Sequence, residues 1–286
     1  MTSPSPTMPS ANARRIGLLI WPREHGAWGM LLVPLVTGAA AGFRTGRSLA
    51  GLFLFVLAAL ALFCLRTPAE ALLQTTPWRA SSEREKGAVY ISIAVYLSVA
   101  TAALGLLLIW KGDYLLLPLG GMAFLFFLAQ AGIKKLGREN RVLGQLIGSA
   151  GLTSTAAGGY YVVSGRLDET ALVAWGLNWL FAANQIQYVQ LRIQSAQAKF
   201  RGEKLLRGGN FLMGQAVTII LLFVAWLRGD IHPWLSLAFV PVFYRGTAWF
   251  FKKPAPLRIH RLGLSELAHA IIFGVLLILA VYLSAV

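Results

Sequence analysis

Charged residues are scarce in this chain, and acidic residues are the scarcest. Only 13% of the 286 residues are Asp, Glu, Lys or Arg, whereas a soluble domain carries about 25%. The single cysteine, Cys64, excludes an intrachain disulfide. The first residues also lack the basic cluster, apolar core and small-residue cleavage site of a signal peptide. The shortage of charge argues against a soluble fold.

Long apolar runs take the place of the missing charges, and 57% of the residues are hydrophobic. Runs of roughly 17–25 residues fit a bilayer core about 30 Å thick. Alternation of period two is absent, and helices satisfy their own backbone groups in lipid. We therefore predict an all-α, polytopic membrane protein of about nine transmembrane helices. The predicted spans are Gly26–Phe43, Ser48–Leu65, Gly87–Trp110, Tyr114–Ile133, Val142–Ser164, Thr170–Tyr188, Asn210–Leu227, Pro233–Phe251 and Ser265–Leu283.

The basic residues are unevenly divided between the two sides of these spans. Twenty-one of the 26 lie in the N-terminal arm and the even-numbered loops. The other five are Arg44, Arg47, Lys111, Arg166 and Arg228. The positive-inside rule then predicts a cytoplasmic N-terminus and an outside C-terminus. The net charge of +15 is spread over alternate loops and forms no single stripe, so we expect membrane lipids as partners and no nucleic acid.

Local signals divide the chain further. Residues 1–20 begin with a Ser- and Pro-rich stretch and are predicted to be a disordered cytoplasmic tail, and 21–286 a single transmembrane domain. Thr67-Pro-Ala-Glu70 has a capping residue, a proline and a Glu in the order that starts a helix, which predicts a break there. Ser82-Glu-Arg-Glu85 predicts another helix start. The glycines of the fifth span predict close helix packing.

Two Glu and His pairs stand at predicted membrane borders. Glu24 and His25 enter the first span within Trp21–Trp28, and Glu266 and His269 lie three apart on one face of the ninth. His25, Glu266 and His269 are the acid–base candidates, facing a shared polar pocket. The alternative is interfacial anchoring by the tryptophans and a hydrogen-bonded pair in the ninth span. With four histidines in all, no metal site is predicted.

Two polar helix ends supply candidate ligand-binding residues. Asn184, Tyr188 and Arg192 follow four-residue steps at the end of the sixth span, and Arg66, Glu70 and Gln74 do the same after the second. We expect the arginines to face an anionic headgroup, because guanidinium groups suit phosphate oxygens. The full set of ligand-binding candidates is Glu24, Arg66, Glu70, Gln74, Arg79, Arg84, Asn184, Gln187, Tyr188 and Arg192.

The opening string Arg23-Glu-His-Gly-Ala-Trp-Gly-Met-Leu-Leu-Val-Pro34 resembles the start of the YwiC-like family of bacterial membrane proteins. The likeness is expected to cover the chain from about Trp21 to the C-terminus and implies a bacterial inner (cytoplasmic) membrane, but no particular reaction. The architecture is also remotely similar to the UbiA superfamily of intramembrane prenyltransferases. That resemblance implies a UbiA-like helical bundle and magnesium held by Asp-rich motifs at the two mouths. Here those motifs are missing, and Mg²⁺ binds through carboxylates and phosphates.

These observations favour a membrane protein that binds a lipid or isoprenoid-like ligand in a cavity open to the cytoplasm. Divergent transferase activity without the usual metal clusters stays open, as do the cofactor and the oligomeric state. The rival hypotheses are a small-solute transporter and a non-catalytic subunit of a membrane complex. The spans show no pair of interrupted, repeat-related helices, which are the pattern typical of transporters.

Overall fold

The described parts of the chain are helical, and no strand occurs in them. The computed structural model describes residues 11–22, 25–45, 49–73, 80–198, 200–253 and 256–284, with side chains at all of these except 11–14, 25, 45 and 138. This confirms the predicted all-α class.

All nine predicted spans coincide with helices. Seven correspond to single helices: α2 (His25–Gly42), α3 (Ala50–Leu72), α4 (Glu83–Leu106), α5 (Leu116–Lys135), α8 (Glu169–Gln194), α10 (Gly209–Leu227) and α13 (Ile259–Leu283). The fifth and eighth are each divided in two: α6 (Arg141–Thr153) with α7 (Thr155–Ser164), and α11 (Pro233–Leu237) with α12 (Val240–Phe251). The short elements are α1 (Ala11–Ile20), η1 (Phe43–Thr45), the π-turn η2 (Leu107–Lys111), η3 (Arg138–Asn140) and α9 (Arg201–Arg207).

Five of the described helices are long and apolar enough to cross a membrane by themselves. These are α3, α4 together with η2, α5, α10 and α13. The apolar part of α2, Gly26–Gly42, is shorter. Helix α8 has the length, but Asn, Gln and Arg fill its second half. The count of about nine crossings therefore exceeds what helix length and composition establish.

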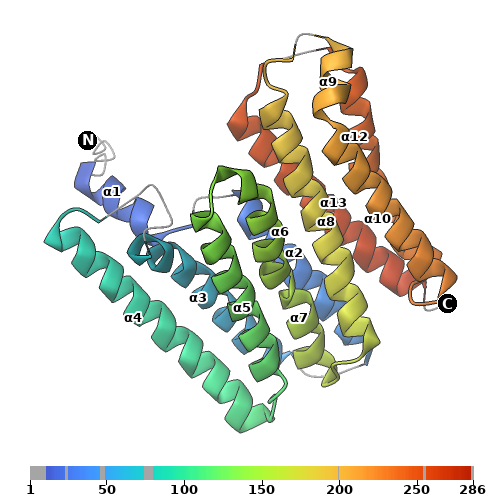
Figure 1. Ribbon diagram of the computed structural model, residues 1–286. Helices are drawn as coiled ribbons and strands as arrows, with labels where there is room; N and C mark the ends of the chain where they lie inside the picture. The colour runs from blue at the N-terminus through green and yellow to red at the C-terminus, as the bar shows by residue number, and fades with distance from the viewer. Residues whose placement is uncertain are drawn as a thin grey trace, which may run out of the picture.

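Helix α2 lies between the two halves of the bundle (Figure 1). On one side it packs against α7, where a Cβ added to Gly38 would clash with the carbonyl oxygen of Ala156. On the other side it packs against α13, where a Cβ on Gly274 would lie 2.9 Å from Val33. Small residues let membrane helices approach until their backbones touch. The predicted packing role of the fifth-span glycines also holds, since Gly159 meets the Leu35 carbonyl.

The core is divided in the same way. One cluster of buried side chains joins α2, α3, α5 and α7 around Phe55, Tyr160 and Val163. Another joins α8, α11, α12 and α13, where the rings of Phe181 and Phe273 stack at 4.0 Å. The halves appear as the blue-to-green and yellow-to-red helices of Figure 1. A buried hydrogen bond of 3.0 Å from Asn178 Nδ2 to Thr37 Oγ1 ties α8 to α2.

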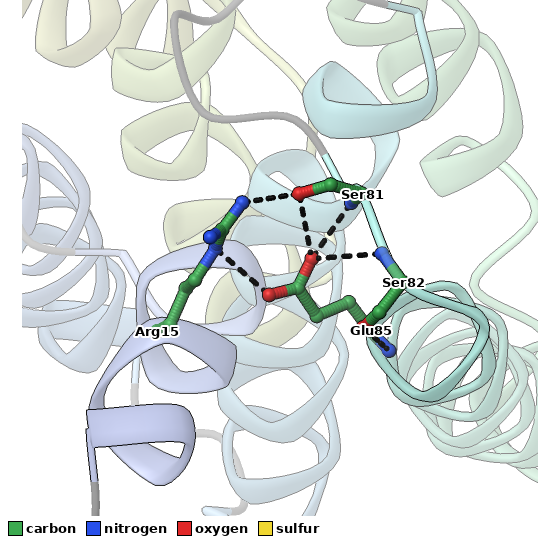
Figure 2. Close-up of polar contacts among 4 residues, drawn as sticks. All are labelled: Arg15, Ser81, Ser82 and Glu85. Carbon is green, nitrogen blue, oxygen red and sulfur yellow. Dashed lines mark hydrogen bonds and ion pairs between the residues drawn. The ribbon is translucent and has the colours of Figure 1, made fainter.

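Residues 11–20 differ from the predicted disordered tail, because they form α1. Leu19 is 2% exposed and packs with Ala71 of α3 and Val89 of α4. Figure 2 shows the polar contact that accompanies this packing: the Arg15 guanidinium pairs with Glu85 at 2.8 Å. Glu85 also accepts from the backbone of Ser82 in the capping box that the sequence predicts. Helix α1 therefore docks on the first turn of α4.

The predicted helix break at Thr67–Glu70 is wrong. Helix α3 continues through Pro68 to Leu72. Proline removes one backbone donor, but membrane helices tolerate it where neighbouring groups compensate. The cap-like order of residues is therefore a local signal that the long apolar helix overrides.

The α2–α7 contact yields a stability prediction. Gly38→Ala forces the two backbones apart and is expected to cost about 1–3 kcal/mol of unfolding free energy, the usual range for overpacking. The measurement is chemical unfolding in detergent micelles. Gly176→Ala on α8 is the matched control, because its added Cβ meets nothing within 4 Å. Equal stability of the two variants would contradict the contact.

Candidate functional site

A charged triad lies where α3 and α5 end. Glu70 Oε1 accepts from Arg66 Nε at 3.0 Å and from Lys134 Nζ at 2.8 Å. The side chains are 16%, 19% and 29% exposed, respectively. Two cations on one carboxylate leave the triad with a net positive charge. Of the predicted candidates, Arg66 and Glu70 are thus brought together, and Lys134 joins them from a helix that the prediction did not include.

A large apolar cavity of about 790 Å³ is lined in part by Arg66. Its walls come mainly from α3, α4, α5 and α6, and most of its lining side chains are Leu, Phe and Ala. The polar lining side chains are Arg66, Gln130, Ser154 and Thr155. The hydroxyls of Ser154 and Thr155 are bonded to helix carbonyls. The volume is typical of sites for drug-sized ligands, about 300–1,000 Å³.

A second polar centre lies in the other half of the bundle. Arg245 of α12 and Glu266 of α13 form an ion pair of 2.6 Å, with side chains 9% and 5% exposed. The Arg245 guanidinium also lies over the Tyr188 ring, 4.1 Å from its centroid. Tyr188 in turn accepts from Arg192 Nη1 through its hydroxyl at 3.3 Å. The predicted polar face of the sixth span therefore turns Asn184 and Tyr188 into the protein, where Tyr188 meets Arg245.

Several polar atoms of this centre find no hydrogen-bond partner among the described residues. They are both amide atoms of Asn184, Gln187 Oε1, Gln215 Nε2, Arg245 Nε and Nη2, and Glu266 Oε2. Gln187 lies against Gly214 of α10, and Gln215 against Gly246 of α12. Gln185 Nε2 donates to the Glu266 carbonyl at 2.7 Å. A polar layer thus crosses α8, α10, α12 and α13. Buried groups of this kind cost stability unless water or a ligand bonds them.

His269 does not join Glu266. Its Nδ1 lies 2.7 Å from the carbonyl oxygen of Ser265, one turn back on the same helix. The partner of Glu266 is Arg245, which the prediction counted only as a loop cation. Arg245 stands inside the predicted apolar span Pro233–Phe251, and an ionisable residue in such a run is the signal that identifies it.

The other candidates are either outside the described residues or exposed. Glu24, Gln74 and Arg79 lie outside the described residues, as does the side chain of His25 at the start of α2. Arg84 is exposed on the first turn of α4. No residue of α8 or later lines the cavity that Arg66 lines. The two polar helix ends that the sequence assigns to one cavity thus belong to separate halves.

The carboxylates do not suit a resident magnesium ion. Glu70 is bound by two cations and Glu266 by one. Across the described residues, no three His, Cys, Asp or Glu side chains cluster closely enough to hold a metal. Magnesium requires carboxylate and phosphate oxygens, and the donors present here are mostly guanidinium and amide groups.

The apolar helices and their exposed Leu, Ile, Val and Phe side chains define an integral membrane protein with several crossings. The family described as YwiC-like protein matches residues 21–160, close to half of the chain. The predicted YwiC-like resemblance is thereby confirmed. The matched stretch contains Arg66, Glu70 and Lys134 and ends before α8. No curated protein and no solved structure matches the chain.

The buried ion pair yields a prediction by double-mutant cycle. Glu266→Leu leaves the Arg245 guanidinium buried without its counter-charge and is expected to cost about 3–5 kcal/mol. Adding Arg245→Leu removes the unpaired buried charge, so the double variant should regain most of the lost unfolding free energy. Unfolding in detergent measures both.

The control for this cycle is Glu83→Ala. Glu83 pairs with Lys86 on the surface and is 88% exposed, so its loss should stay within about 1 kcal/mol. A Glu266→Leu variant as stable as Glu83→Ala would show that the pair is not buried.

Proposed function

We propose that this YwiC-like membrane protein binds a long-chain lipid, of isoprenoid type, in the cavity between α3, α4 and α5. The observation that carries the proposal is the joining of an apolar cavity of about 790 Å³ to a cationic triad. An apolar chain fills such a lining, while Arg66 and Lys134 attract an anionic headgroup through charge-assisted hydrogen bonds.

The length of the cavity favours a long chain. Its α3 wall extends from Phe55 to Leu73, which is about 27 Å at 1.5 Å per residue. One leaflet of a bilayer core spans about 15 Å, half of the full thickness. A polyisoprenoid therefore matches the wall better than a single acyl chain does.

Binding, and not transfer, is what the cavity supports. Its described lining contains no Asp, Glu, His, Cys, Lys or Tyr, so no acid–base group faces the apolar chain. Glu266 and His269 lie on α13, which contributes nothing to this lining. Among the described lining residues, a prenyl-transfer step as in the UbiA superfamily finds neither metal donors nor a catalytic base.

The same proposal includes nine crossings and a cytoplasmic N-terminus. Residues 141–164, the two halves of the fifth span, rise about 36 Å at 1.5 Å per residue, enough for a bilayer core. Helix α8 turns its amides toward other helices, as Asn184 and Gln185 are 2% exposed, so lipid does not meet them. The excess of basic residues in alternate loops supports a cytoplasmic position for the triad and the cavity mouth in the bacterial inner membrane.

Co-purifying lipid tests the proposal. Native mass spectrometry in mild detergent should detect one equivalent of an isoprenoid lipid. Gly120→Phe should abolish it, because Gly120 lines the cavity and an added Cβ meets nothing within 4 Å. The matched control is Gly105→Phe on α4, which is equally free of contacts but does not line the cavity.

The headgroup contact has its own pair of variants. Lys134→Gln should lower lipid retention about tenfold, the effect of one charge-assisted hydrogen bond. Lys135→Gln, its exposed neighbour, should not. Retention unchanged in both Gly120→Phe and Lys134→Gln would exclude this cavity as the binding site.

A second candidate function, passage of small polar solutes, is favoured by the polar layer around Arg245 and Glu266. Proteoliposomes should then swell faster in glycerol or urea than empty liposomes. The Arg245→Leu/Glu266→Leu variant should swell no faster than empty liposomes, because it replaces both charges with apolar groups. Swelling of the native protein at the rate of empty liposomes would remove this candidate.

A further inference from the structure

A second cavity, of about 110 Å³, lies at the end of α8 against α9 and the end of α12. Its lining residues are Arg192, Ser195, Ala196, Ala198, Lys204, Trp249, Lys252, Lys253 and Leu257. Four of these are cations, and none of the described lining residues is Asp or Glu. Cations that converge without a counter-charge create a positive potential that favours an anion.

Lys204 is a buried cation in the lining of this cavity. It is only 2% exposed, although lysine is almost never fully buried unless it is paired. Its ammonium donates to the carbonyl oxygen of Lys252 at 2.7 Å and lies 4.4 Å from the Trp249 ring centroid. Burial lowers the pKa of Lys204, and the charges of Arg192 and Arg201 lower it further. The carbonyl and ring contacts hold the cation in place, but neither supplies a full negative charge.

Ser195 provides an independent observation at the same place. It is 5% exposed, and its hydroxyl finds no hydrogen-bond partner among the described residues. A buried hydroxyl without a partner costs stability, so such groups in native proteins usually meet water or a ligand. Ser195 also lines the cavity, so its unsatisfied hydroxyl supports a ligand site at this place.

Arg192 is another lining residue of this cavity. Its guanidinium lies 5.9 Å from the ring centroids of both Tyr188 and Trp249, and one nitrogen donates to the Tyr188 hydroxyl. A guanidinium group carries five N–H donors, so this bond leaves others for a ligand. The two aromatic rings position the Arg192 guanidinium group at the cavity, where its planar set of N–H donors can bind the oxygens of a phosphate.

We infer that this cavity binds a phosphate-type anion between Arg192, Lys204, Ser195 and the two lysines that follow α12. Its volume is several times the roughly 10–15 Å³ that one water needs on this measure, so a group with several heavy atoms fits. Free inorganic phosphate and the phosphodiester of an anionic lipid headgroup share this chemistry. The cavity shares no lining residue with the apolar cavity of the N-terminal half, so the inference stands apart from the lipid-binding proposal.

Ser195→Ala is the most direct test. Without an anion the substitution removes an unsatisfied hydroxyl, so the thermal midpoint of the detergent-solubilised protein should stay equal or rise. Inorganic phosphate should raise the midpoint of the native protein and bind about tenfold more weakly to Ser195→Ala, the effect of one lost hydrogen bond. A merely structural role for Ser195 would lower the midpoint and leave phosphate affinity unchanged.

The lysine pair adds a charge test. Lys252→Gln/Lys253→Gln alters exposed residues, so it should fold normally. Phosphate affinity should fall about tenfold and become less dependent on salt. Arg261→Gln is the control, since Arg261 is an exposed cation of α13 outside the lining.

Two further arms identify the source of the anion. Nanodiscs of phosphatidylglycerol are compared with nanodiscs of phosphatidylcholine, each with and without inorganic phosphate. Stabilisation by free phosphate in phosphatidylcholine assigns a soluble anion. Stabilisation by phosphatidylglycerol alone, lost in Ser195→Ala, assigns a headgroup. No stabilisation in any arm, or equal stabilisation of the native protein and both variants, overturns the inference.

Discussion

The backbone-to-backbone contact of α2 with α7 is the constraint on which both halves of the bundle depend. Gly38 meets the carbonyl of Ala156 and Gly159 meets that of Leu35, so neither helix can carry a larger side chain there. The opposite face of α2 packs on α13 at Gly274. In lipid, helix association depends on such close packing, because apolar tails compete equally for apolar side chains. One short helix thereby holds two groups of helices together.

The two halves are chemically different as a result. The N-terminal half encloses an apolar cavity in which Arg66 is the one charged residue of the described lining. The C-terminal half buries its charge, with the Arg245 and Glu266 pair surrounded by amides of α8 and α10. Desolvation makes an unpaired charge in this position expensive, so the arginine and the glutamate require one another. The family match lies over the first half, which contains the cavity.

Some parts of the site could be predicted from local spacing. Four-residue steps placed Asn184, Tyr188 and Arg192 on one helix face, and α8 turns Asn184 and Tyr188 into the protein. The link from Glu266 to Arg245 could not be predicted in this way, because it joins two helices through packing. Lys134 joined Arg66 and Glu70 for the same reason. The local capping signals at Thr67–Glu70 predicted a helix break that does not occur, because the apolar helix α3 continues through Pro68.

Composition and hydropathy alone determined that the chain is helical and built for a membrane, because apolar runs of this length leave no other way to satisfy the backbone. The nine predicted spans also coincide with helices, although α1 and α9 were not predicted. Only the tertiary structure decided that the two polar helix ends face different interiors. That outcome depends on which helices pack side by side. Contacts between residues far apart in the chain decide this packing. Hydrophobic runs and charge counts contain no information about such contacts.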